Sequence, residues 1–177
     1  MNNCSFVEAS KWEQKAMLDV VPFLESTTES VILTSLNGKM SRILQKRFGD
    51  AIVASKNGRM IGIELKAEEE NKHGNLFLET WSNRKRRTVG WMYYCDADKL
   101  FYFFCKERAM YSMDMHELQS WAFDKKRIYE FPEKEQSKYT QMNDTWGRCV
   151  PIPVIRDELA SFKEFRFGGE FGLLIDR

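Results

Sequence analysis

A β-hairpin predicted at residues 49–68, GDAIVASKNGRMIGIELKAE, constrains the fold of this chain more than any other segment. Two apolar stretches of strand length flank Asn57-Gly58, a dipeptide that favours a tight turn between antiparallel strands. Because side chains alternate between the two faces of a strand, Glu64 and Lys66 share one face. The segment therefore predicts a hairpin with one apolar face and one charged face.

Two pairings of this hairpin are compatible with the turn residues. A two-residue turn places Asp50 opposite Leu65, so that its side chain points away from Glu64. A three-residue loop over 56–58, with Gly58 left-handed in a bulge, places Asp50 directly opposite Glu64. The second pairing also gathers five apolar side chains on the opposite face, namely Ala51, Val53, Ile61, Ile63 and Leu65.

The charged face has a composition that suits metal-assisted hydrolysis. In the second pairing, Asp50 and Glu64 bring two carboxylates beside the ammonium group of Lys66. Oxygen ligands of this kind are preferred by hard divalent cations such as Mg²⁺, and a bound cation activates water. These residues therefore predict phosphodiester-cleavage chemistry, provided that the second pairing is adopted.

The bulk properties indicate one folded domain over residues 1–177. A hydrophobic content of 43% with 14% aromatic residues is enough for a packed core and argues against disorder. No apolar run reaches the roughly 18 residues of a membrane span, and the N-terminal segment lacks the pattern of a secretion signal. We expect no membrane partner.

The cysteines and histidines do not form a metal-binding pattern. The four cysteines are far apart in the sequence, and there are only two histidines, so we do not expect a zinc site. Free thiols are typical of a reducing compartment, and we expect a cytoplasmic protein.

The formal net charge of +1 does not by itself indicate a nucleic-acid-binding protein, but the basic residues are clustered. Clusters of this kind bind phosphates, although each also fits a solvated face. The candidate nucleic-acid contacts are Arg42, Lys46, Arg47, Arg84, Lys85, Arg86 and Arg87.

The remaining pattern predicts further helices and strands around the hairpin. A capping box at Ser10 predicts a helix that Pro22 kinks or ends. Further helices are expected at 39–48, where Gly49 would cap the C-terminal end, and at 83–95. Two more helices are expected after Asp114 and after Asp157, and residues 131–147 are expected to form a loop. Strands are expected at 31–36, 75–81, 100–105 and 109–113, with an edge strand at 150–155. This order predicts a mixed sheet with helices on its faces.

Asp50 followed by Glu64-Leu65-Lys66, within an α-β-β-β-α-β order, resembles the PD-(D/E)XK nuclease superfamily. That superfamily includes restriction endonucleases, Holliday-junction resolvases and phage nucleases. The resemblance implies a restriction-endonuclease-like α/β (α+β) fold with a core over about 8–106 and a C-terminal extension over about 107–177. The chain departs from the strict motif because Gly49 stands where many members have proline.

The resemblance also implies roles for individual residues. Asp50 and Glu64 would bind Mg²⁺, for which Mn²⁺ could substitute, together with the backbone carbonyl of Leu65. Lys66 would orient the attacking water or stabilise the charge that develops on the phosphate.

Two further acidic residues match positions that some members of the superfamily use. Glu13 would approach the metal from the first helix, and Glu79 would lie at the active site on the third strand. Each residue also has an explanation without a metal: Glu13 fits the last position of the capping box, and Glu79 fits a solvent-exposed position on a strand.

We therefore expect a Mg²⁺-dependent DNA endonuclease, of phage or mobile-element type. The expected partner is nucleic acid, in the first place DNA, and a homodimer is compatible with cutting both strands. An alternative is a catalytically inactive nuclease fold that binds nucleic acid or protein. A third interpretation is an unrelated small α/β protein whose acidic patch is accidental.

Overall fold

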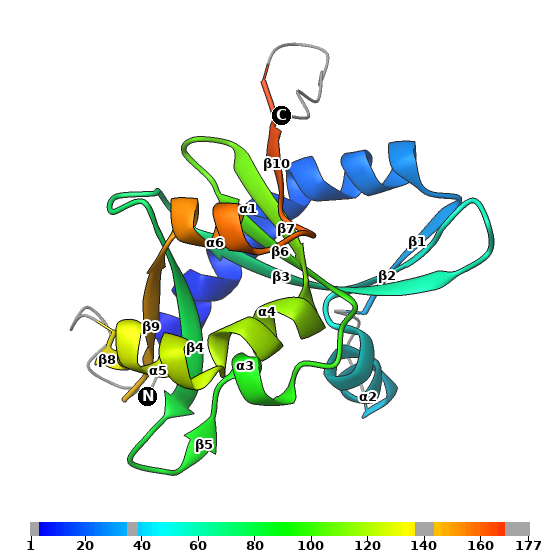
Figure 1. Cartoon of the computed structure of the whole chain (residues 1–177). Helices are drawn as coiled ribbons and strands as arrows, with labels where there is room; N and C mark the ends of the chain where they lie inside the picture. Colours follow the sequence, from blue (N-terminus) through cyan, green and yellow to red (C-terminus); the bar gives the residue numbers. More distant parts are fainter. Residues whose placement is uncertain (1–3, 35–38, 137–143, 169–177) are drawn as a thin grey trace.

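The structure is a computed structural model that describes residues 4–34, 39–136 and 144–168 (Figure 1). The helices are α1 (Cys4–Thr27), α2 (Lys39–Phe48), α3 (Trp91–Tyr94), α4 (Met115–Ala122), α5 (Lys125–Glu130) and α6 (Ile152–Glu158). The strands are β1 (Ser30–Leu33), β2 (Ala51–Ala54), β3 (Met60–Glu68), β4 (Asn75–Asn83), β5 (Thr88–Val89), β6 (Lys99–Phe104), β7 (Ala109–Asp114), β8 (Lys134–Glu135), β9 (Trp146–Pro151) and β10 (Lys163–Arg166). No helix of these described residues is long and apolar enough to cross a membrane.

The central sheet is mixed, as the sequence predicted. Its strand order is β1-β2-β3-β6-β7-β10, in which β3 and β6 run parallel and all other neighbours are antiparallel. The strands β7 and β10, from the predicted C-terminal extension, complete one side of this sheet. A second, antiparallel sheet has the order β5-β4-β9-β8.

Each face of the central sheet is covered by an apolar layer. On one face, α1 buries Ala16, Val20 and Leu24 against side chains of β2, β3 and β6. On the other face, β6 and β7 pack against the second sheet and helices α3, α4 and α6 (Figure 1).

The hairpin of β2 and β3 adopts the second of the two predicted pairings. Ala51 pairs with Ile63 and Ala54 with Met60, so the same register places Asp50 opposite Glu64. Gly58 closes the three-residue loop with φ +79°, the left-handed conformation that a bulge of this type requires. The apolar side chains predicted for the opposite face all pack in the layer against α1.

Helix α1 differs from its prediction at both ends. It begins at Cys4, so Ser10 lies inside the helix, and it continues beyond Pro22 to Thr27. The proline removes one backbone hydrogen bond, to the carbonyl of exposed Leu18, which water can satisfy. Buried residues on both sides of the proline pack against the sheet, and this packing stabilises the helix more than the proline destabilises it.

The helix predicted at 83–95 is wrong except for its last turn. Strand β4 continues to Asn83, whose side-chain oxygen accepts from the backbone N–H of Arg86. This is the turn-forming use of asparagine, and Arg87 with φ 55° completes the reversal into β5. Only α3 remains helical, because the chain reverses before the apolar spacing of 89–93 can form a longer helix.

Three further predictions require correction. Strand β4 belongs to the second sheet and not to the central one. The expected edge strand at 150–155 is divided, because β9 ends at Pro151 and Pro153 fits the first turn of α6, where its missing N–H costs nothing. Moreover, β9 lies between β4 and β8, not at an edge. Asp157 lies inside α6 and does not cap a later helix.

Other predicted elements are confirmed. Helix α2 has the predicted bounds, and Gly49 follows it with φ +77°. The apolar run at 100–105 forms the central strand β6, and 109–113 forms β7. Asp114 caps α4 by accepting a hydrogen bond from the backbone N–H of Glu117.

Candidate functional site

The candidate site lies at an open edge of β3. Strand β2 begins at Ala51, which pairs with Ile63, so the second half of β3 has no β2 partner on that side. Asp50 occupies this position: its N–H donates to the carbonyl of Ile63 at 2.7 Å, and its Oδ2 accepts from the N–H of Leu65 at 2.9 Å. Asp50 therefore makes the hydrogen bonds with β3 that a residue of a neighbouring strand would otherwise make. The carbonyl of Leu65 faces the same edge, because the N–H and C=O of one strand residue point the same way.

Gly49 allows Asp50 to approach β3 this closely. A Cβ atom on Gly49 would lie 2.5 Å from the carbonyl oxygen of Ile63, and the positive φ also disfavours any other residue. Many members of the superfamily carry proline here. In this chain, the combination of the α2 cap and the close strand contact requires glycine.

Lys66 binds two of the carboxylates predicted for the site. Its Nζ lies 2.7 Å from Oε1 of Glu64 and 3.6 Å from Oε1 of Glu13. Glu13 comes from α1, which packs on the other face of the sheet, so it reaches Lys66 past the open edge of β3. Glu64 is only 9% exposed, and the ammonium supplies the charge that a buried carboxylate needs.

Glu79 reaches the same group of charges from β4 of the second sheet. Its carboxylate accepts a hydrogen bond from the backbone N–H of Trp91 at the start of α3, and it interacts electrostatically with Lys66, Glu64 and Glu13. Gly90 makes the contact possible, since a Cβ there would lie 2.4 Å from the carbonyl oxygen of Glu79.

The pKa values of three carboxyl groups at the site, those of Asp50, Glu13 and Glu79, are raised, in each case mainly by burial. Burial, followed by repulsion from Glu64, raises the pKa of Asp50 from 3.8 to about 7, although Lys66 and the Leu65 N–H oppose this shift. Burial is also the main cause of the raised pKa values of Glu13 and Glu79. The site therefore holds more negative charge than Lys66 alone can neutralise.

Lys66 remains protonated in this environment. Burial alone would lower the pKa of its ammonium group, but attraction from Glu64, Glu13 and Asp50 outweighs burial and raises it. Lys66 thus acts as a fixed positive charge and not as a general base.

Tyr94 joins the site although the sequence did not indicate it. Burial raises the pKa of its phenol, and Lys66, Glu64 and Glu79 all contribute to its electrostatic environment. The predicted helix at 83–95 gave no reason to select this residue. Only the turn after Asn83 and the short helix α3 bring it to the acidic group.

The donor set is suited to a hard cation, but the side chains are not arranged as a ready ligand cluster. Within the described part of the chain, no three His, Cys, Asp or Glu side chains lie close enough together to hold a metal ion. Glu64 is bound to Lys66 instead. However, the mutual repulsion of Asp50 and Glu64 is the interaction that a divalent cation relieves, and both offer oxygen ligands.

The predicted nucleic-acid contacts are distributed over two places. Lys46 and Arg47 are exposed on the last turn of α2, and Arg47 forms an ion pair with Asp96 at 2.9 Å. The side chain of Arg42 lies outside the described residues. The other four, Arg84, Lys85, Arg86 and Arg87, form the turn between β4 and β5, whereas the sequence placed them before a helix.

The turn between β4 and β5 projects from the lower edge of the molecule in Figure 1. Along β4, Arg84 lies five residues from Glu79, or roughly 16 Å at the rise of a β-strand. The guanidinium of Arg84 stacks on the ring of Trp146 at 4.2 Å, which fixes the base of the turn.

No protein family matches the sequence, and comparisons with curated proteins and with solved structures found no match. The assignment of a function therefore depends on the geometry of the site.

Proposed function

We propose that this protein is a metal-dependent nuclease that hydrolyses phosphodiester bonds, in the first place those of DNA. One observation carries the proposal. Lys66 pairs with carboxylates from α1 and β3 at the open edge of β3, and the carboxylates of Asp50, before β2, and Glu79, on β4, interact with it electrostatically. A structural ion pair needs one carboxylate, and the additional ones raise the energy of the folded state unless a cation is bound.

The residues divide between holding the cation and acting on the substrate. Asp50, Glu64 and the carbonyl of Leu65 would hold Mg²⁺ or Mn²⁺, which when bound supplies Lewis acidity and a more acidic water. Lys66 would orient the attacking water and stabilise negative charge on the phosphate. Glu13 and Glu79 would accept hydrogen bonds from water molecules around the cation.

The topology supports membership of the PD-(D/E)XK superfamily. Helix α1 is followed by the antiparallel strands β1, β2 and β3, and β6 then returns parallel to β3 after α3. This succession follows the α-β-β-β-α-β order, with β4, β5 and α2 as additions. Asp50 precedes β2 and hydrogen-bonds β3 at Ile63 and Leu65, beside Glu64 and Lys66, which is an arrangement compatible with the motif.

The basic turn between β4 and β5 favours a polymeric substrate. Its four basic residues directly follow the strand that carries Glu79, at a distance of a few nucleotides from it. Contacts to phosphates at this distance position a nucleic acid without reading its sequence. A small phosphate ester would not reach them.

A plasmid-nicking assay tests the proposal. We expect supercoiled DNA to be cleaved with Mg²⁺ or Mn²⁺ and to stay intact with EDTA. Glu64→Gln should reduce cleavage at least 100-fold while the fold is retained. Glu25→Gln, on the exposed side of α1, is the matched control and should cleave as the wild type does.

Two results would decide against this function. Cleavage that survives Glu64→Gln would show that the activity does not come from this site. Binding of DNA without cleavage under any metal condition would favour the inactive nuclease fold instead.

A further inference from the structure

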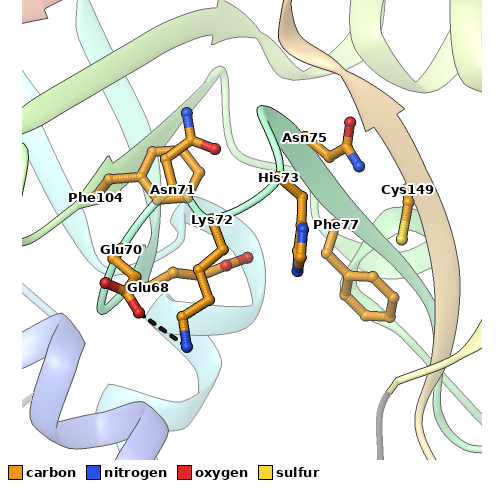
Figure 2. A pocket seen from close by; sticks show the side chains of 9 residues that line it. All are labelled: Glu68, Glu70, Asn71, Lys72, His73, Asn75, Phe77, Phe104 and Cys149. Atoms are coloured by element: carbon orange, nitrogen blue, oxygen red, sulfur yellow. Dashed lines mark ion pairs between the residues drawn. The ribbon is translucent and has the colours of Figure 1, made fainter.

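A cavity of about 160 Å³ lies on the charged face of β3, next to the candidate site (Figure 2). Glu64, Lys66 and Glu68 alternate along β3 and share one face, and Glu68 forms part of the cavity wall. The Cα atoms of Lys66 and Glu68 are therefore about 7 Å apart, close to the spacing of neighbouring nucleotides in an extended strand.

The wall of the cavity combines flat apolar groups with hydrogen-bonding groups. Figure 2 shows Phe77 and His73 on one side and Phe104 with Asn71 on the other. Phe104 is buried and forms the floor of the cavity, whereas Phe77 is half-buried and His73 is exposed. Accessible aromatic side chains stack on nucleobases, and amide groups match the donors and acceptors of a base edge. The cavity is too small for a drug-sized ligand, which needs roughly 300 Å³ or more.

A tyrosine beneath the cavity fixes Glu68. The hydroxyl group of Tyr102 donates to Oε1 of Glu68 and accepts from the backbone N–H of Phe77 at 3.2 Å. The hydrogen bond from Tyr102 holds the carboxyl group of Glu68 in one orientation against the cavity. Burial raises the pKa of this carboxyl group.

The charges at the rim are paired with one another. Glu70 forms ion pairs with Lys72 at 2.9 Å and with Lys106 at 2.8 Å, which lower its pKa to about 2. Lys106 also lies 3.2 Å from Glu69, so the two lysines offset these two carboxylates.

We infer that the cavity receives one unpaired base of the nucleotide beside the phosphate held at Lys66. This inference rests on the proposed function and adds a substrate class to it: single-stranded nucleic acid, or a duplex from which one base is turned out. A fully paired duplex would leave the cavity empty, because its bases are stacked on one another.

Cys149 provides a reporter for the test, since it lines the cavity and is a free thiol. The rate of its alkylation by N-ethylmaleimide is followed by peptide mass spectrometry at pH 8.5, because burial raises the pKa of this thiol. The full chain is used with EDTA, so that no cleavage occurs. The probes are an oligothymidylate of eight nucleotides and an abasic oligomer of the same length.

We expect the oligothymidylate to slow alkylation of Cys149 at least fivefold and the abasic oligomer to have little effect. His73→Ala should weaken binding of the oligothymidylate about tenfold, as loss of one stacking partner predicts. The matched control His116→Ala, which changes an exposed side chain of α4, should bind as the wild type does.

The outcomes separate this inference from the proposed function. Equal protection by both oligomers, or binding without protection, would overturn the base site while leaving the nuclease proposal in place. Absence of any binding to the oligomers, measured by fluorescence anisotropy, together with an intact plasmid in the nicking assay, would overturn both.

Discussion

Asp50→Asn should make the protein more stable and inactive at the same time. The pKa of Asp50 rises from 3.8 to about 7, which corresponds to roughly 4 kcal/mol of unfavourable free energy once the group is ionised. Asparagine keeps an oxygen to accept from the N–H of Leu65, but its amide group needs a partner, and we subtract about 2 kcal/mol for this. The expected gain is about 2 kcal/mol, or 4–8 °C in Tm for a chain of this size.

The gain in stability from Asp50→Asn should increase as the pH rises. The folded state binds the Asp50 proton more tightly than the unfolded state, so the wild type loses stability as the pH rises from about 4 to 7. The variant should therefore be about 2 kcal/mol more stable than the wild type above pH 7, equally stable at a pH between 4 and 7, and about 2 kcal/mol less stable near pH 4, where only the cost of the amide group remains. Most surface carboxylates behave in the opposite way, because their pKa values are lowered on folding.

Thermal unfolding with EDTA at pH 4.5, 6 and 8 measures this difference. The control Asp96→Asn removes an exposed carboxylate that pairs with Arg47 and should change stability by less than about 1 kcal/mol. Mg²⁺ should raise the Tm of the wild type and not that of Asp50→Asn. A destabilised Asp50→Asn at pH 8, or equal stabilisation of both proteins by Mg²⁺, would refute the reasoning.

Three further changes test other parts of the site. Lys66→Met should abolish cleavage and destabilise the protein by about 3 kcal/mol in urea unfolding, because it leaves Glu64 buried without its counter-charge. Gly49→Ala should cost more than about 2 kcal/mol and Gly58→Ala about 1 kcal/mol, since both have positive φ but only Gly49 is in close contact with β3. The affinity for Mg²⁺, measured by calorimetry, should fall about tenfold per pH unit below pH 7 as protons compete for Asp50.

The hairpin shows how much of the site was predictable from local sequence. The turn residues left two pairings open, and the structure adopts the one that buries all five apolar side chains together. Asp50, Glu64 and Lys66 were therefore found from residues within one hairpin. Helix α2 and its cap at Gly49 were predictable for the same reason.

Features that depend on distant contacts were not predictable. Tyr94 reaches the site because the chain reverses at 84–87, and this reversal is fixed partly by hydrogen bonds to Asp144, almost sixty residues away. The second sheet forms because β4 finds β9, and nothing in residues 75–83 distinguishes it from a strand of the central sheet. Glu13 was selected from a resemblance, and its contact with Lys66 could not have been inferred from its own helix.

The proposed function gives Lys66 two roles that oppose each other. Its 2.7 Å contact with Glu64 compensates a nearly buried carboxylate in the metal-free protein, so it stabilises the fold there. For Glu64 to serve as a metal ligand, Lys66 must release it and turn toward the substrate phosphate. Burial and, after it, repulsion from Glu64 raise the pKa of Asp50, and in the proposed function a bound cation would relieve both effects in place of a proton. The site is consequently least stable when it is ionised and empty, which is the state that favours binding of a divalent cation at neutral pH.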